Sequence, residues 1–399
     1  MLKQLPDYFT KVDILFVRFL LGKSNLHQDK DYNDGLGADS REERDVDETQ
    51  ETGWNQRILL SVEKEKKIQV LEEQQEQQRQ NTLLTNYFQK ILLSTIKEKL
   101  TDTKKIINDN LQMQSQQVEL LTALVAKEPR YSLLAEQLKA DSYIRNHLMS
   151  LVASQDFMAS LGRDKRIVDD LQIAVGMMGT NALRYVVPAL MFKQRISGLK
   201  IHNQIYLLFV KKLWRYQLTL GQACTVLMQE AGYRRPFEGH ILAAMLNFAY
   251  TASFNQYLAS FEQVRHQCIA ESREKDLKRN YLFYQDFKSD LASFQSLMVG
   301  KSDLKMSLAL ATEIFPKDFQ HLLLALKEQI DNVDFEARSL LGKIVYQATC
   351  FAKYEQLRVV RIFKREWLDD YLTTAHISMD TFKKLSQQDL FRFKPNWPQ

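Results

Sequence analysis

Apolar residues along this chain recur at helical spacing, and no stretch alternates apolar and polar residues for long enough to predict a strand. The first segment, residues 1–22, ends at a glycine and predicts a short amphipathic helix whose apolar face carries Phe9, Val12, Phe16, Phe19 and Leu20. We expect this helix to dock on a core or on a partner. A helix lying on a membrane surface is the alternative, but its polar face carries few basic residues.

The next two segments differ sharply in pattern. Residues 23–53 hold many acidic and almost no large apolar side chains, which predicts a disordered linker. Residues 54–115 return to helical spacing around a glutamine-rich stretch, EEQQEQQRQ at 72–80, that has no apolar stripe. We expect a long helical segment there. A homo-oligomer formed through residues 54–115 stays open, although no clean heptad repeat persists.

The remainder of the chain reads as a run of amphipathic helices interrupted at glycine and proline. We divide it into a main domain at 116–335 and C-terminal helices with a tail at 336–399. Within it we expect separate helices at 236–256 and 258–271, and one continuous helix over 334–369. The closing residues FRFKPNWPQ (391–399) contain two prolines, so they cannot be helical throughout. We expect them to pack on the body or to hang as a peptide tail.

Composition supports an all-α fold. Glycine (13) and proline (7) are scarce in 399 residues, and both residues disfavour helix interiors. The three cysteines are too few and too far apart for a disulfide framework or a thiolate cluster, which fits a reducing cytoplasm. The N-terminal stretch lacks the apolar core of a secretory signal, and no apolar run is long enough to span a bilayer. We therefore expect a cytoplasmic protein.

Charge is distributed unevenly. Residues 24–53 hold ten acids and three bases, a net charge of −7, which leaves +12 on the rest of a chain whose net charge is +5. A basic stripe in the predicted helix at 334–369 (Arg358, Arg361, Lys364, Arg365) is expected to be a solvated face, with an acidic partner or the acidic linker as the alternative. Nucleic acid is not favoured as a partner, because no recognition motif accompanies the positive charge.

Four stretches in order resemble the HDOD domain, a relative of the HD phosphohydrolases that occurs in bacterial signalling proteins. They are LLAEQLKADSYIRNHLMSLVASQDFM (133–158), VDDLQIAVGMMGTNALRYVVPALMF (168–192), KLWRYQLTLGQACTVLMQEAGYRRPFEGHILAAMLNFAY (212–250) and, more weakly, GKSDLKMSLALATEIFPKDF (300–319). The resemblance covers about half of the chain and implies a multi-helical HD-like domain with an N-terminal helical extension. The residues that it marks as framework are Asp141, Ala174, Gly179, Trp214 and Pro316.

The departures from the family pattern concern the metal site. Where catalytic HD enzymes have a metal-binding His-Asp pair, this chain has Asn247-Phe248, and Phe248 cannot coordinate a cation. Tyr216 stands where a histidine is frequent, and only Ser302 or Asp303 lies near the position of the last expected histidine. The resemblance therefore implies a degenerate HD site with no catalytic residue, no metal and no cofactor. We expect a ligand pocket, if one exists, around Asn247, Phe248 and Tyr216.

An enzyme with relocated ligands is the second interpretation. None of the seven histidines adjoins an aspartate or forms an H-x-H or H-E-x-x-H pattern. Metal-assisted hydrolysis needs several ligands on one centre, so at least three of five dispersed residues would have to converge: His202, Glu238, His240, Asp303 and His321.

The leading hypothesis is a non-catalytic signalling or regulatory protein that acts by binding a protein partner. A metal-dependent phosphohydrolase with relocated ligands and a nucleic-acid-binding regulator that uses the positive body are the alternatives.

Overall fold

The computed structural model describes residues 7–22, 61–126, 129–197, 204–288, 294, 302–388 and 390, with the main chain alone at 7–9, 61–68, 197, 204–206 and 302–303. The described part is all-α and contains no strand, which confirms the predicted fold class. No helix in these residues is both long enough and apolar enough to cross a bilayer. The predicted acidic linker, the closing segment 391–399 and His202 lie outside the described residues.

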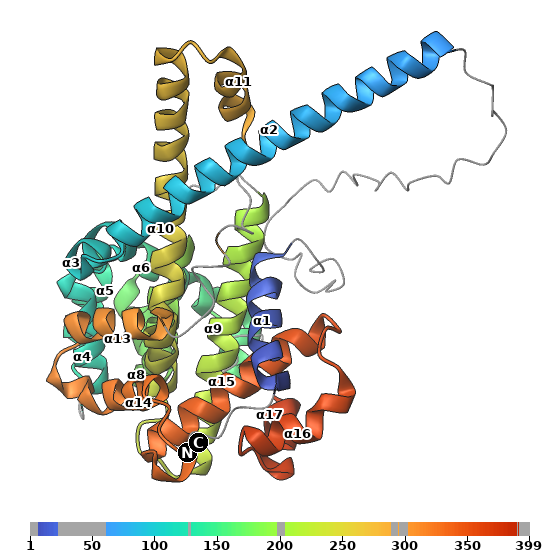
Figure 1. The fold of residues 1–399 in the computed structure, drawn as a ribbon. Coiled ribbons are helices and arrows are strands. Elements are labelled where there is room, and N and C mark those ends of the chain that lie inside the picture. The colour runs from blue at the N-terminus through green and yellow to red at the C-terminus, as the bar shows by residue number, and fades with distance from the viewer. Residues whose placement is uncertain are drawn as a thin grey trace. The chain divides into compact units, whose positions relative to one another are not determined.

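The elements follow one another along the chain in this order: α1 (Asp7–Leu21), α2 (Ser61–Lys99), α3 (Thr103–Lys105), the π-helical turn η2 (Ile106–Leu111), α4 (Ser115–Val125), α5 (Tyr131–Ala140), α6 (Ser142–Ala153), α7 (Gln155–Ser160), α8 (Leu171–Ser197), α9 (Gln204–Glu230), α10 (Glu238–Glu274), α11 (Lys278–Asp286), α13 (Ser302–Ile314), η4 (Lys317–Phe319), α14 (Gln320–Ile330), η5 (Phe335–Ala337), α15 (Leu340–Val359), η6 (Arg365–Trp367), α16 (Leu368–Thr374) and α17 (Met379–Gln387) (Figure 1).

Side-chain caps explain where several of these helices begin. The Asp141 carboxylate accepts a hydrogen bond from the Ile144 N–H at the start of α6, and the Ser339 hydroxyl accepts one from Gly342 at the start of α15. Ser378 caps α17 in the same way, through its side chain and the Thr381 N–H. Each cap satisfies a backbone donor that has no partner inside its helix.

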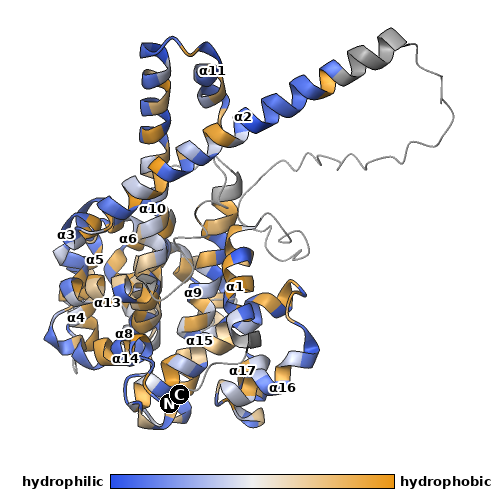
Figure 2. Cartoon of the chain, in the orientation of Figure 1, coloured by the Kyte–Doolittle hydropathy of each residue, from blue (hydrophilic) through white to orange (hydrophobic). Residues whose placement is uncertain are grey.

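The chain divides into two compact units. Unit 1 comprises residues 1–24, 93–261 and 289–399. In this unit α8 packs against α4, α5 and α6, while α9 packs against α15. The most apolar helices of unit 1 lie in its interior, with polar residues on outward faces (Figure 2).

The first helix is part of unit 1. α1 packs against α9 and α15 and buries Val12, Phe16, Phe19 and Leu20, which are four of the five residues predicted for its apolar face. The buried Lys212 of α9 donates hydrogen bonds from Nζ to the carbonyl oxygens of Phe19 (2.6 Å) and Gly22 (2.7 Å) at the end of α1. α1 is therefore docked on its own chain through an apolar face and through its last carbonyl groups.

Unit 2 comprises residues 25–92 and 262–288. Phe88 of α2 packs on Tyr284 of α11 and on Phe287, with ring centroids 6.1 and 4.8 Å apart. Residues 72–79 of α2 are all polar and exposed, and Figure 2 shows a long hydrophilic stretch along this helix. Val70, Leu71 and Leu83 are each at least 46% exposed.

Two helix predictions were wrong. Residues 236–256 and 258–271 were expected to form two helices but belong to the single helix α10, because no glycine or proline interrupts them. The helix expected over 334–369 ends at Val359, and Arg361 adopts a left-handed conformation (φ 58°). The predicted basic stripe is therefore not one helical face.

Candidate functional site: an acidic-edged apolar pocket

The three residues of the predicted degenerate site are buried and have different partners. The side-chain amides of Asn247 and Gln217 lie 2.6 Å apart between α10 and α9. Tyr216 packs on Phe16 of α1 with ring centroids 4.5 Å apart, and burial raises its pKa far above the ordinary value. Phe248 stacks on Phe315, which follows α13, at 6.1 Å. The structure thus places Asn247, Phe248 and Tyr216 in packed surroundings.

The residues that the family resemblance marks as framework lie at packing contacts or at helix breaks. Ala174 is buried within α8, and Gly179 interrupts that helix with φ 75° and ψ 160°, a conformation that strongly favours glycine. Trp214 lies under the Lys193 ammonium, 5.5 Å from its ring centroid. Pro316 follows α13 and precedes η4.

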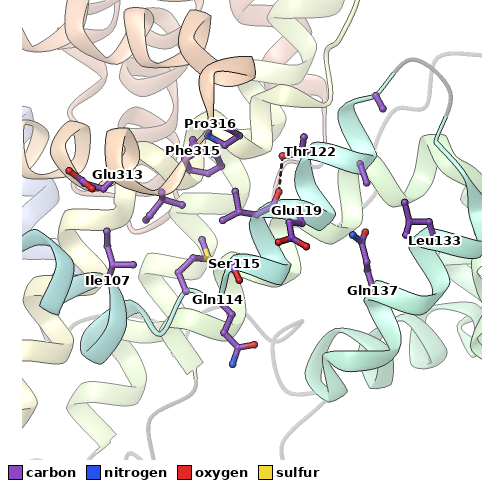
Figure 3. A pocket seen from close by; sticks show the side chains of 15 residues that line it. Ile107, Gln114, Ser115, Glu119, Thr122, Leu133, Gln137, Glu313, Phe315 and Pro316 are labelled. Carbon is purple, nitrogen blue, oxygen red and sulfur yellow. Dashed lines mark hydrogen bonds between the residues drawn. The ribbon is translucent and has the colours of Figure 1, made fainter.

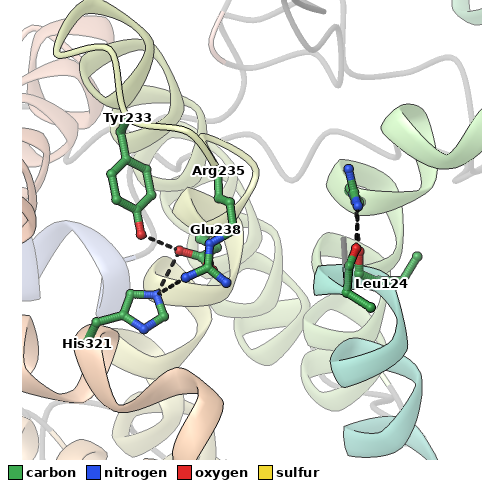
Figure 4. Close-up of polar contacts among 7 residues, drawn as sticks. Leu124, Tyr233, Arg235, Glu238 and His321 are labelled. Carbon is green, nitrogen blue, oxygen red and sulfur yellow. Dashed lines mark hydrogen bonds and ion pairs between the residues drawn. The ribbon is translucent and has the colours of Figure 1, made fainter. Parts of the chain in front are cut away.

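Two of the five dispersed candidate ligands come together. The carboxylate of Glu238, which is fully buried, lies 2.9 Å from His321 Nε2, and Figure 4 shows Tyr233 and Arg235 pointing at the same carboxylate. The Tyr233 hydroxyl donates to Glu238 at 2.7 Å. The Arg235 guanidinium lies 3.1 Å from Glu238 and 3.3 Å from His321 Nε2. A permanent cation therefore occupies the position where a metal ion would need to bind.

His240 does not join this cluster. Its ring is 1% exposed, stands edge-on to Tyr185 and lies over Gly221, and burial lowers its pKa to about 4. His202 and the side chain of Asp303 lie outside the described residues. Among the side chains that the structure does describe, no three of His, Cys, Asp and Glu gather in a group that could hold a metal ion.

A pocket of about 870 Å³ opens in unit 1 among η2, α4, α5 and the end of α13. Figure 3 shows Leu133 and Gln137 on one wall, Phe315 and Pro316 on another, and α4 between them. The apolar part of the lining includes Ile107, Met113, Val118, Leu133, Phe315 and Pro316. Its volume lies in the range of small-ligand and peptide-anchor pockets.

Two of the residues singled out in the sequence analysis lie in or against this pocket. The framework residue Pro316 lines it directly, and Phe248 stacks on Phe315, which also lines it. The Ser307 hydroxyl of α13 accepts a hydrogen bond from the Ala249 N–H and donates one to the Leu246 carbonyl oxygen, each at 3.1 Å. These contacts hold α13 against α10 on either side of Asn247-Phe248.

A buried polar network holds the edge of the pocket between η2 and α4. The Arg195 guanidinium of α8 donates to the Leu111 carbonyl oxygen at 3.0 Å and to the Gln117 side chain at 2.6 Å. Gln117 and Gln194 in turn donate to the two carboxylate oxygens of Asp141, at 2.7 and 3.3 Å. Asp141 thus connects α4, α6 and α8, which gives a physical reason for a carboxylate at this framework position.

The ionisable side chains that line the pocket are all acidic. Its lining contains two ionisable side chains, Glu119 of α4 and Glu313 of α13, and both are exposed. Neither carboxylate forms an ion pair with any residue in the described ranges. The Oε1 atom of Gln137 is buried and has no hydrogen-bond partner in the described structure. The pocket therefore offers apolar surface, two carboxylates and one unused acceptor to a ligand that brings donors.

This pocket could not be predicted from the sequence. Its lining comes from residues 107–137 and 313–316, and each stretch alone reads as an ordinary amphipathic helix with its cap. Leu133 lies beside the apolar face of α5, and only the structure shows that its side chain is 44% exposed. Such single exposed residues are common and carry no information alone.

Comparison with known proteins agrees with the sequence motifs. Residues 112–286 match the family model of the HDOD domain. A candidate phosphohydrolase from Shewanella amazonensis aligns with a TM-score of 0.45 and 16% identity over 73% of this chain and 96% of its own. An HDOD domain protein of unknown function from Geobacter sulfurreducens gives 0.44 and 14%, over 75% and 92%. No curated protein matches the sequence.

The resemblance to the HDOD domain that the motifs predicted is thus confirmed by the family match over residues 112–286, and the described residues in this range are all-α. α4 to α11, with the central helices α8, α9 and α10, fall within the matched residues, while α13 and Pro316 lie beyond them. With TM-scores below 0.5, the two solved structures do not indicate which residues of this chain act. The pocket is assigned from the side chains of this chain alone.

Proposed function

We propose that this protein is a non-catalytic bacterial signal-transduction or regulatory protein that acts by binding a protein partner through its HDOD domain. The observation that carries the proposal is the pocket lined by α4, α5 and the end of α13, with Glu119 and Glu313 at its edge. An apolar floor beside two exposed carboxylates suits a protein segment that presents apolar side chains together with lysine or arginine.

The Glu238 cluster supports a binding role over hydrolysis. A metal-activated water needs a cation held by several ligands and an open position. Here Arg235 bonds to both Glu238 and His321, so a metal ion would have to displace a guanidinium. A phosphohydrolase with relocated ligands is tested by metal analysis of the purified protein. One metal ion per chain together with phosphatase activity would favour that alternative.

The direct test is capture of partners by the full chain and by two variants. Ala123 lines the pocket, and Ala123→Arg fills it with a long cationic side chain. Ala153 is an exposed alanine on α6 and is not a lining residue, so Ala153→Arg is the matched control. We expect a partner retained by the wild type and the control to be lost by Ala123→Arg. Equal capture by all three would contradict the proposal.

Point variants are preferable to removal of residues 1–115. Such a deletion would strip α1 from α9 and α15 and expose the surface that Phe16 and Phe19 cover.

The exposed apolar side chains on α2 leave self-association through residues 54–115 as a second proposal. Its test is sedimentation of a Leu71→Glu/Leu83→Glu variant, which should shift towards monomer. The cytoplasmic location also stays a prediction.

The nucleic-acid alternative is tested separately. Phosphate contacts release counterions, so binding through the positive body would weaken steeply with salt. Absence of binding to mixed DNA or RNA at low salt would remove that alternative.

A further inference from the structure

The closing residues 391–399 have a composition that complements the pocket. Phe391 and Phe393 alternate with Arg392 and Lys394, and Trp397 follows. In an extended backbone this alternation places aromatic side chains on one side and bases on the other. Pro395 favours an extended conformation at the residue before it, which reduces the entropy lost when such a segment binds.

The pocket offers the matching groups. Its floor includes Val118 and Phe315, and its two charged side chains, Glu119 and Glu313, are both acidic. Gln137 Oε1 has no donor in the described residues although it is buried, and Figure 3 shows the Gln137 side chain directed towards Glu119. A backbone N–H of an extended segment laid along α5 would supply that donor. An unpaired buried acceptor costs free energy, so its satisfaction favours occupancy.

We infer that this pocket binds residues 391–399 of a second copy of the chain. Phe391 and Phe393 would contact the apolar floor, while Arg392 and Lys394 would pair with Glu119 and Glu313. The inference rests on the proposed binding function of the pocket and names its partner. Each copy would donate one segment and accept one, which gives a closed dimer if the exchange is reciprocal and an open chain if it is not.

The place of the segment in the fold favours a second copy over the same chain. The segment follows α17 and the buried Leu390. Phe382 of α17 packs on Phe351 and Tyr354 of α15. In Figure 1, α17 and the pocket helices α4 and α13 lie on opposite sides of unit 1. Nine residues span at most about 30 Å when extended, and the segment would need to pass around the unit to reach its own pocket.

The first experiment measures peptide binding. A fluorescent, amidated peptide of residues 388–399 is titrated into the chain that lacks 391–399, and its anisotropy is recorded. We expect saturable binding that is about five- to tenfold weaker for Glu119→Lys and for Glu313→Lys, because charge reversal replaces attraction by repulsion. Glu136→Lys, an exposed change on α5 that is not in the lining, should leave binding unchanged.

Charge exchange and chain association complete the test. A peptide with Arg392→Glu and Lys394→Glu should bind the Glu119→Lys/Glu313→Lys chain better than it binds the wild type. In sedimentation velocity, the Leu71→Glu/Leu83→Glu chain, in which α2 no longer offers these apolar side chains, should still associate as its concentration rises. Removal of 391–399 from that variant should abolish this association. Circular dichroism checks that each variant is folded.

Three outcomes would overturn the inference. They are absence of peptide binding, equal binding by the wild type and the Glu119→Lys variant, and a full chain that stays monomeric while peptide binds only after the segment is removed. The last outcome would make the segment of the same chain the occupant. If the peptide fails to bind while Ala123→Arg still loses a captured partner, the proposed function stands and only the named occupant is wrong.

Discussion

His240 should make the folded chain sensitive to mild acid. Its imidazole is 1% exposed, and burial lowers its pKa from 6.5 to about 4. The unfolded chain therefore binds a proton at a higher pH than the folded chain does. Stability linked to His240 is fully present above pH 6.5 and is lost as the pH falls from 6.5 towards 4.

The magnitude follows from the two pKa values. At pH 5 an imidazole with a pKa of 6.5 is almost fully protonated, whereas one with a pKa of about 4 is about nine-tenths neutral. The difference in proton binding between pH 8 and pH 5 lowers the free energy of unfolding by about 2 kcal/mol. The perturbation is His240→Gln, which keeps a polar side chain of similar size and removes the titration.

The assay is urea unfolding at pH 8, 7, 6 and 5, followed by circular dichroism. We expect the wild type to lose about 2 kcal/mol more than His240→Gln between pH 8 and pH 5. His266→Gln, the same substitution at an exposed histidine of α10, is the control for the loss of a histidine. Wild type and His240→Gln with parallel pH profiles would refute the reasoning.

Three further predictions concern close contacts in unit 1. Gly221→Ala should cost about 1–3 kcal/mol in urea unfolding, because its Cβ would clash with Nδ1 of the His240 ring. Asp141→Ala should cost about 2–3 kcal/mol in the same assay, because it removes the α6 cap and the acceptors for two glutamines. Lys212→Met should leave the carbonyl oxygens of Phe19 and Gly22 without their donor and speed proteolysis at the end of α1.

Each of these has an outcome that contradicts it. Wild-type stability of Gly221→Ala would mean that the His240 ring moves aside without cost. An Asp141→Ala loss no larger than that of Asp156→Ala, an exposed aspartate in the first turn of α7, would mean that the network contributes nothing. Unchanged cleavage kinetics of Lys212→Met would show that the apolar face alone holds α1.

The helical class and the HDOD match over residues 112–286 could be predicted because their signals are local. Glycine at 179 and proline at 316 fall at observed breaks, and the apolar face of α1 follows from spacing within five turns. Helix ends that carry neither glycine nor proline could not be predicted from the sequence. Asp276 and Arg361 adopt left-handed conformations beyond the ends of α10 and α15, and neither residue type distinguishes that position from a helix interior.

The site was harder to predict because it depends on tertiary packing. Asn247, Phe248 and Tyr216 were chosen by position within the family pattern, and each finds a separate neighbour in the fold. The contact of Arg235 with Glu238 is local, three residues apart, but the association of Glu238 with His321 of α14 joins residues 83 positions apart. Spacing along a sequence does not determine such distances.

The burial of Lys212 gives the chain a built-in chemical reporter. Its pKa is lowered to about 8 by burial, so near that pH the amine has substantial intrinsic nucleophilicity. The side chain is only 1% exposed, however, because its nitrogen is turned towards the end of α1. An amine-reactive reagent can therefore modify Lys212 only in molecules whose first helix has lifted away. The labelling rate of this one lysine, read by mass spectrometry, would count such molecules in a population that is otherwise folded.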